Sequence, residues 1–159
     1  MPVDGRLLAL LDARLIATLA TTNEDGSAYL SAVWFLREGD DILIATGGRT
    51  HKARNAAARP TAALLLHNRA DGPLRGAAAT GRIAVTRGAE ARELNERVWR
   101  KYLTPAGLTH AEVGESIRAH DDVTLRFTPA EWRTWGTDED FGGAFELPGI
   151  AYPLDTIDS

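Results

Sequence analysis

The chain has 159 residues, 44% of them hydrophobic, and a formal net charge of −4 at pH 7. This length suits one domain with a sizeable core, and the acidic balance argues against a general nucleic-acid-binding protein. The sequence has no cysteine, which excludes disulfides, thiolate zinc sites and thiol catalysis, and no apolar run approaches the roughly 18 residues of a membrane span.

The N-terminal third predicts a short helix followed by strands joined through tight turns. Residues 5–12 form the expected helix, and residues 14–22, 28–37 and 41–46 are apolar, β-branched-rich strands. The turn at 23–26 ends on Gly26, which can supply the positive φ that hairpins favour. Since a parallel crossover needs about a dozen residues or more, these short turns indicate antiparallel pairing.

The rest of the chain alternates helices and strands. Residues 50–59 read as a helix with Thr50 as N-cap and Pro60 as its stop. Strands follow at 61–68 and 76–86, where Gly81 indicates a bulge, then helices at 90–103 and 110–119 and a last strand at 122–133. Six strands with inserted helices predict an α+β protein built on a small β-barrel.

A basic segment follows the predicted strand at 41–46 and includes the predicted helix at 50–59. No Asp or Glu occurs between Asp41 and Asp71, a stretch that contains five cationic side chains: Arg49, Lys52, Arg54, Arg59 and Arg69. One interpretation is a solvated surface helix, which is what basic runs usually are. The absence of any counter-charge over some thirty residues favours the alternative, a site built to hold an anion.

The start of the 50–59 helix is where we expect that anion. A helix N-terminus presents unpaired N–H groups and the positive end of the dipole, which together favour phosphate. Thr50 adds a hydroxyl and Lys52 a point charge, and Asn55 and Arg59 lie three and seven positions after Lys52, which predicts that they share its face. Thr46, at the end of the preceding strand, belongs to the same predicted set.

The order of several segments resembles a known family. The sequence runs ATLATTNEDGS, SAVWF, a Gly-bearing turn before Thr50-His51-Lys52, RNAAARPTAALLL, a strand with Gly-Arg, and RTWG. Over residues 7–136 this is similar to the pyridoxamine 5′-phosphate oxidase-like, FMN-binding split barrel proteins. Within them it most resembles the actinobacterial flavin/deazaflavin oxidoreductases, many of which use coenzyme F420.

The resemblance implies a fold and an assembly. The fold is a six-stranded antiparallel split β-barrel with peripheral helices, in a cofactor-binding domain of residues 1–136 followed by an acidic, Gly- and Pro-containing tail at 137–159. The assembly is a homodimer with two cofactors at its interface. With no basic n-region or cleavage site at the N-terminus, we expect a cytoplasmic protein with neither a nucleic-acid nor a membrane partner.

It also implies site residues. Thr50 and Lys52 would hold the cofactor phosphate, helped by Arg49 and Arg54, and the segment Ser31, Ala32, Val33 and Trp34 would lie along the ring. Arg133 and Trp135 would come from the other subunit. Two positions depart from the family pattern: the family often has Arg where this chain has His51, and Pro where it has Ala32.

The expected cofactor is coenzyme F420, with FMN as the alternative. F420 carries a phosphodiester and several glutamates, and five cations exceed what one monophosphate needs. The implied activity is hydride transfer to a small electron-poor organic substrate, such as an enone or a quinone. The alternatives are an FMN-dependent oxidase or reductase and a non-catalytic carrier of the cofactor.

No catalytic residue is assigned from the sequence, and no metal site is expected. Tyr29 and His67 are the polar strand residues that could donate a proton, although each also reads as structural. His67 is also the one strand histidine that could serve as an axial haem ligand, and a core or rim role is the stronger interpretation. His110 and His120 lack the i, i+4 spacing of a helical metal pair, so we expect loop and capping roles for them.

Overall fold

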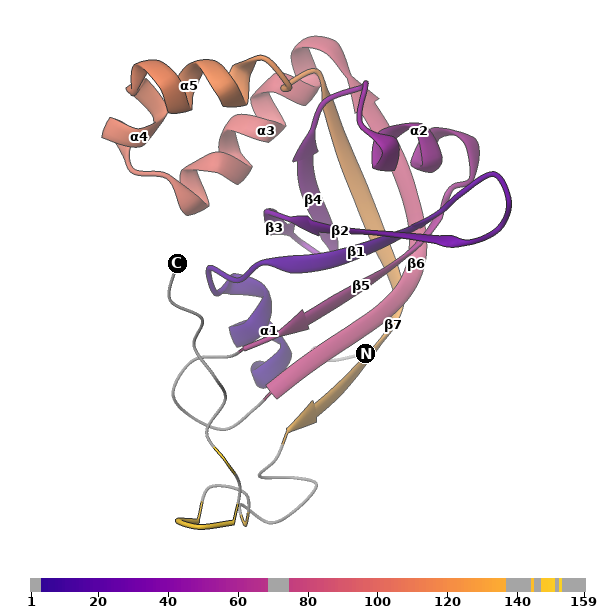
Figure 1. The fold of residues 1–159 in the computed structure, drawn as a ribbon, viewed down its shortest axis with the longest axis vertical. Coiled ribbons are helices and arrows are strands. Elements are labelled where there is room, and N and C mark those ends of the chain that lie inside the picture. Colours follow the sequence, from indigo (N-terminus) through magenta and orange to yellow (C-terminus); the bar gives the residue numbers. More distant parts are fainter. Residues whose placement is uncertain (1–3, 69–74, 137–143, 145–146, 151, 153–159) are drawn as a thin grey trace.

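A twisted antiparallel sheet organises the protein, shown as a computed structural model in Figure 1. The structure describes residues 4–68, 75–136, 144, 147–150 and 152. Within them the sheet has seven strands in the order β2-β1-β5-β6-β7-β4-β3. Their bounds are β1 Ala17–Thr22, β2 Ala28–Val33, β3 Phe35–Glu38, β4 Asp41–Thr46, β5 Thr61–His67, β6 Arg75–Arg87 and β7 Val123–Gly136.

Helices cover the margins of this sheet. Their bounds are α1 Gly5–Asp12, α2 His51–Ala58, α3 Gly88–Tyr102, α4 Pro105–Thr109 and α5 Ala111–Arg118. Figure 1 shows α3, α4 and α5 together at one end of the molecule, with α2 beside the same end of the long β6–β7 pair and α1 nearer the other end. α3 packs on β4 and β7, and α2 packs on β1, β6 and β7.

Alternating side chains give the sheet one buried face. In β1 every second residue is buried, which is the pattern expected of a strand with one face in the core. Apolar side chains from six of the strands are less than 2% exposed: Leu19, Phe35, Ile42, Ile44, Leu64, Leu66, Ile83, Leu125 and Phe127. Burial of these side chains, together with those of α1, is the main favourable term holding the barrel closed.

The predicted strand count of six is wrong, because the expected strand 28–37 is two strands. Val33 pairs with Ala17 on β1, whereas Phe35 pairs with Ile44 on β4, so the chain changes neighbours at Trp34. The Tyr102 hydroxyl holds this junction: it accepts from the Phe35 N–H at 3.2 Å and donates to the Leu15 carbonyl at 2.7 Å. The two strands thereby lie at opposite ends of the strand order.

Other predicted bounds shift by a few residues. β1 begins at Ala17, three residues later than expected. The helix expected at 110–119 is confirmed as α5, and α4 is an additional helix directly before it. Thr104 caps α4 and Pro105 opens it, a signal that the sequence contained. Local predictions at two glycines are confirmed: Gly26 has φ +84°, and the β6–β7 register shifts at Gly81.

Among the described residues, no helix combines the length and the apolar character needed to cross a bilayer.

Candidate anion and cofactor site

A pocket of about 230 Å³ lies where the β2–β3 junction faces the start of α2. Ala32, Val33 and Trp34 form one wall, and Ala45 of β4 lies beside them. Lys52 of α2 and Trp99 of α3 complete the lining. Three of the four residues predicted to lie along a ring therefore meet the lysine predicted to bind a phosphate.

Lys52 is the cation of this pocket. Its side chain is half-buried, and no ion pair between described residues involves it. Burial lowers the pKa of the Lys52 ammonium below its usual range. A charge that is partly removed from water without a protein counter-ion is stabilised by a bound anion, which is the arrangement expected of a phosphate ligand.

The first turn of α2 supplies backbone donors next to Lys52. Thr50 is the N-cap, and its hydroxyl accepts from the Ala53 N–H at 3.3 Å and donates to the Gly47 carbonyl at 2.8 Å. The Thr46 hydroxyl lies 3.0 Å from the Thr50 hydroxyl. Both threonines therefore shape the turn, while the backbone N–H groups of His51 and Lys52 have no acceptor among the described residues. An anion at this turn would meet those two amides and the ammonium.

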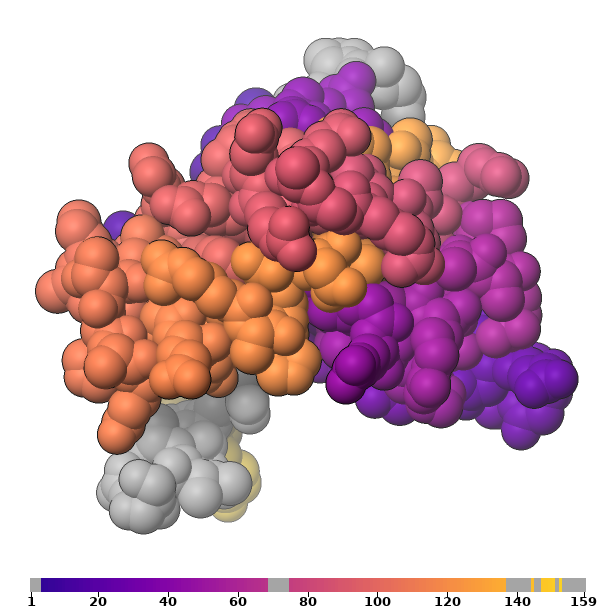
Figure 2. Space-filling view, turned by 90° about the horizontal axis from the view of Figure 1, so that it is seen from above, coloured from indigo at the N-terminus to yellow at the C-terminus, as the bar shows by residue number. Residues whose placement is uncertain are grey.

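A carboxylate that the local sequence could not indicate lies beside this turn. Asp122, just before β7, accepts from the Gly48 N–H at 2.9 Å, and this bond holds the pKa of Asp122 below its ordinary value, with Arg87 and Arg92 adding to the effect. Figure 2 shows the residues leading into β7, in orange, against the purple loop before α2. The segment therefore does have one acid as a neighbour, contributed from 74 positions away.

The remaining predicted cations divide into two groups. Arg49 and Arg54 are exposed and take part in no ion pair between described residues. Arg59 instead donates to the Thr22 carbonyl at 2.6 Å and to the Asn55 side chain at 3.0 Å. Arg69 lies outside the described residues.

Asn55 does not line the pocket. It is buried, and its amide donates to Thr21 and Asn23 on the β1–β2 hairpin at 3.2 and 2.9 Å while its oxygen accepts from Arg59. The expected shared face of Lys52, Asn55 and Arg59 is thus absent, because the last two fasten α2 to the hairpin.

Aromatic rings border the pocket, and an unpaired hydroxyl lies on the residue before its first strand residue. Trp34 stacks on Tyr102 with ring centroids 4.9 Å apart and planes 4° from parallel, and Trp99 is 6% exposed. The Ser31 hydroxyl oxygen, one strand position from Ala32, is buried and has no hydrogen-bond partner among the described residues. A ligand with a planar ring and a phosphate fits this combination of indoles and ammonium.

Arg133 and Trp135 lie far from this pocket in the same chain. Following the pairing register, Arg133 lies opposite Ala78, then Leu65, Thr18 and Ala32 on successive strands. Four strand spacings of about 4.8 Å place Arg133 about 19 Å from Ala32 along the sheet. That separation exceeds the reach of an arginine side chain.

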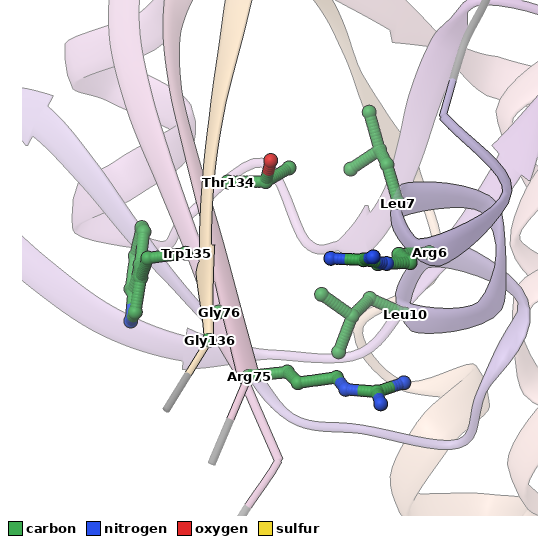
Figure 3. A pocket seen from close by; sticks show the side chains of 8 residues that line it. All are labelled: Arg6, Leu7, Leu10, Arg75, Gly76, Thr134, Trp135 and Gly136. Atoms are coloured by element: carbon green, nitrogen blue, oxygen red, sulfur yellow. The ribbon is translucent and has the colours of Figure 1, made fainter. Parts of the chain in front are cut away.

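Trp135 lies two register pairs beyond Arg133 along β7, away from the α2 end. Its indole covers Gly76 so closely that a Cβ on Gly76 would collide with the ring. Figure 3 shows Trp135 on the opposite side of the β6–β7 pair from Leu7 and Leu10 of α1. The structure therefore separates the two groups of predicted cofactor-binding residues within one chain.

The other polar candidates have local roles. Tyr29 stacks on the His51 ring with centroids 4.6 Å apart, and His67 closes β5, paired with Gly76. The predicted capping role of His110 is confirmed, because its Nδ1 accepts from the Val113 N–H at the start of α5. His120 lies 3.3 Å from the Ser116 carbonyl through its Nδ1.

The sheet order, the peripheral helices and the pocket beside α2 define an α+β split barrel. The chain belongs to the pyridoxamine 5′-phosphate oxidase family, a family of flavin-binding split barrels, whose sequence profile matches residues 3–136. No functionally curated protein matches the chain in sequence.

Solved structures share the fold at low sequence identity. The conserved hypothetical protein Rv2991 of Mycobacterium tuberculosis is 22% identical with a TM-score of 0.72, covering 96% of this chain and 92% of that one. An F420 reductase is 24% identical with a TM-score of 0.58, covering 79% of this chain and 94% of that one. General Stress Protein 26 of Bacillus anthracis is 13% identical with a TM-score of 0.61, covering 84% and 94%.

Proposed function

We propose that the protein is a homodimeric oxidoreductase that binds the deazaflavin coenzyme F420 and transfers hydride to a small electron-poor organic molecule. The observation that carries this proposal is the half-buried Lys52, which lines the pocket with Trp34 and Trp99 and has no counter-ion among the described residues. When bound, the coenzyme would supply the hydride chemistry. The residues of this chain bind and orient it.

Each pocket residue has a defined part in that binding. Lys52 and the first amides of α2 would hold the phosphate, and Trp34 and Trp99 would border the ring. Arg49 and Arg54 are exposed and free of ion pairs between described residues, so they remain for further negative charge beyond the phosphate. An acidic tail such as that of F420 uses such charge, whereas FMN does not need it.

FMN is the second candidate cofactor, and one observation favours it. Of the four cations of this segment that the structure describes, only Lys52 lines the pocket, and Arg59 is committed to the β1–β2 hairpin. A single lining ammonium with two backbone amides is sufficient for one phosphate monoester. The charge argument for F420 therefore rests on Arg49 and Arg54 alone.

Titration with F420 and, separately, with FMN tests the proposal. Replacing Lys52 with Ala should weaken F420 binding by about 10- to 100-fold, because a charged hydrogen bond is lost. Arg100→Ala is the matched control, since Arg100 is exposed on α3 and pairs only with Glu96 among the described residues. Tighter binding of FMN would select the second candidate, and binding of neither cofactor would refute both.

Turnover separates the enzyme from a carrier. The reduced cofactor is mixed with a quinone or an enone, and its oxidation is followed by absorbance with and without the protein. An enzyme accelerates the reaction in proportion to occupied sites. A protein that binds the cofactor tightly without any acceleration across such substrates would be a carrier.

The proposed homodimer rests on the exposed face of the sheet. That face contains a hollow of about 510 Å³ bordered mainly by alanines, threonines and leucines, with Arg133 and Glu131 at its β7 edge. Leu30 in it is 63% exposed. A second copy on this face would bury these side chains and could bring its own Arg133 and Trp135 toward the pocket beside Lys52.

Subunit complementation tests this arrangement. Lys52→Ala and Arg133→Ala chains are each expected to bind the cofactor weakly. If the site combines the two subunits, mixing equal amounts restores one intact site in each heterodimer, or about a quarter of all sites. No recovery on mixing, despite proven subunit exchange, would show that Arg133 does not complete the partner's site.

A further inference from the structure

A chain of polar contacts fixes the protonation pattern of the His51 ring. An arginine can only donate, so the 3.0 Å contact from Arg59 identifies the acceptor on Asn55 as its amide oxygen. The amide nitrogen of Asn55 therefore faces Asn23, at 2.9 Å. Since that nitrogen donates, the Asn23 atom that accepts this hydrogen bond must be the amide oxygen.

The same Asn23 oxygen lies 3.1 Å from Nε2 of His51. An oxygen of a side-chain amide only accepts, so Nε2 carries the hydrogen. The lone pair of the neutral ring is then on Nδ1, which has no hydrogen-bond partner among the described residues. Tyr29 stacks on the ring, with planes 19° apart, and holds its orientation. A proton added to His51 goes to Nδ1 and leaves the bond to Asn23 intact.

The position of His51 makes that proton sensitive to a bound anion. His51 is the first residue of α2, and Lys52, at the proposed phosphate site, is the next. A positive charge is disfavoured at a helix N-terminus and beside Lys52, Arg49 and Arg54. A phosphate bound at this turn reverses the local potential and makes the second charge favourable.

Charged groups on the neighbouring elements act on the same ring. The β1–β2 turn carries Glu24 and Asp25, of which Asp25 accepts hydrogen bonds from the Ser27 N–H and hydroxyl. β2 presents the Tyr29 phenol, and α2 itself carries the cations already named. A bound anion would therefore add negative charge to a region that already holds both signs of charge.

We propose that His51 is a proton-dependent anion-binding residue, which adds a second positive charge beside Lys52 when a phosphate group binds. The inference rests on the proposed function, because it uses the same anion site. It concerns a position where this chain has histidine and the family often has arginine. The ligand class is a phosphate monoester or diester. Binding would take up protons, and affinity would rise as the pH falls across the range of about 5 to 8 in which histidine changes charge.

Sulfate is the probe that tests this, because it remains a dianion throughout that pH range. Sulfate affinity is measured between pH 7.5 and pH 5.5 from the shifts of the His51 and Lys52 amide resonances. The variants are His51→Gln, which keeps a donor for Asn23 without a titratable charge, His51→Arg, which is charged throughout, and Lys52→Ala. Thermal unfolding of each variant confirms that it is folded.

The expected result is an affinity of the unaltered protein that rises about three- to tenfold as the pH falls. His51→Gln should bind weakly and His51→Arg tightly, each without this pH dependence. Equal pH dependence in His51→Gln, or none in the unaltered protein while Lys52→Ala still abolishes binding, would overturn the inference and leave the proposed site intact. Sulfate binding that is absent, or indifferent to Lys52, would overturn both.

Discussion

The buried amide of Asn95 is expected to be among the most costly side chains to remove from this protein. Asn95 is completely buried on α3, and its nitrogen donates to the carbonyls of Asp121 and Val123 at 3.0 Å each. Its oxygen accepts from the Thr124 hydroxyl at 2.7 Å. These bonds join α3 to the start of β7, and a longer contact of 3.5 Å reaches the Thr46 carbonyl at the beginning of the turn before α2, where we propose that an anion binds.

Asn95→Ala leaves two carbonyls and a hydroxyl without this partner. Each buried polar group left unpaired costs about 1–3 kcal/mol, and partial repair by neighbouring groups or water lowers the sum, so we expect a loss of about 3 kcal/mol. In a domain of this size, that loss corresponds to a fall in Tm of about 6–12 °C. Urea unfolding followed by tryptophan fluorescence measures the free energy directly.

A second substitution at Asn95 separates the effect of losing the hydrogen bonds from the effect of losing side-chain volume. Asn95→Asp keeps the shape but places a carboxylate against two carbonyl oxygens, so it should be more destabilising than alanine at pH 8 and should recover as the pH falls and the carboxyl is protonated. Glu93→Ala, on an exposed position of the same helix, is the control and should change stability by less than about 0.5 kcal/mol. A loss below about 1 kcal/mol for Asn95→Ala would refute the reasoning.

Three further predictions follow from charges and close contacts. Hydrogen bonds from Arg97 and Arg126 hold the pKa of Glu38 below 4.5, so Glu38→Gln should lose about 1 kcal/mol in urea unfolding above that pH, and the difference should vanish as the pH falls through the lowered value. Burial lowers the pKa of Lys101 to about 8 from 10.5, so unfolding free energy should rise between pH 8 and 10.5, and this rise should be missing in Lys101→Met. Gly81→Ala would press a Cβ into the backbone carbonyl of Thr128 and should cost more than about 2 kcal/mol by calorimetry; a cost near 1 kcal/mol would mean that the bulge relaxes.

Local sequence signals predicted most of the elements. Thr50 as an N-cap, Gly26 in a hairpin turn and Gly81 at a bulge each depend on the geometry of a few neighbouring residues, and the structure confirms all three. The pattern of apolar runs and short turns likewise predicted the antiparallel α+β barrel. Such features are readable because their causes lie within one turn of the chain.

The features that the sequence did not indicate are all set by distant neighbours. Trp34 lies within a continuous apolar run, and only the competition between β1 and β4 for pairing divides that run into two strands. Asp122 reaches Gly48 across 74 positions, and the amide of Asn95 acquires its partners only when α3 packs beside β7. No local pattern contains that information.

An acidic protein can keep a local cationic surface where several of its acids pair with other arginines of the fold. Glu38 and Asp41 share Arg126, Asp12 pairs with Arg37, and Asp121 pairs with Arg92, as the described part of the chain shows. Asp122 lies beside the basic segment but accepts a hydrogen bond from a backbone N–H of the turn, and it forms no ion pair with Lys52. The net charge of −4 is consequently compatible with a local positive potential at the first turn of α2. Because that potential depends on where the fold places each carboxylate, net charge alone does not exclude the proposed anion, and the gap in acidic residues between Asp41 and Asp71 is the sequence feature that points to it.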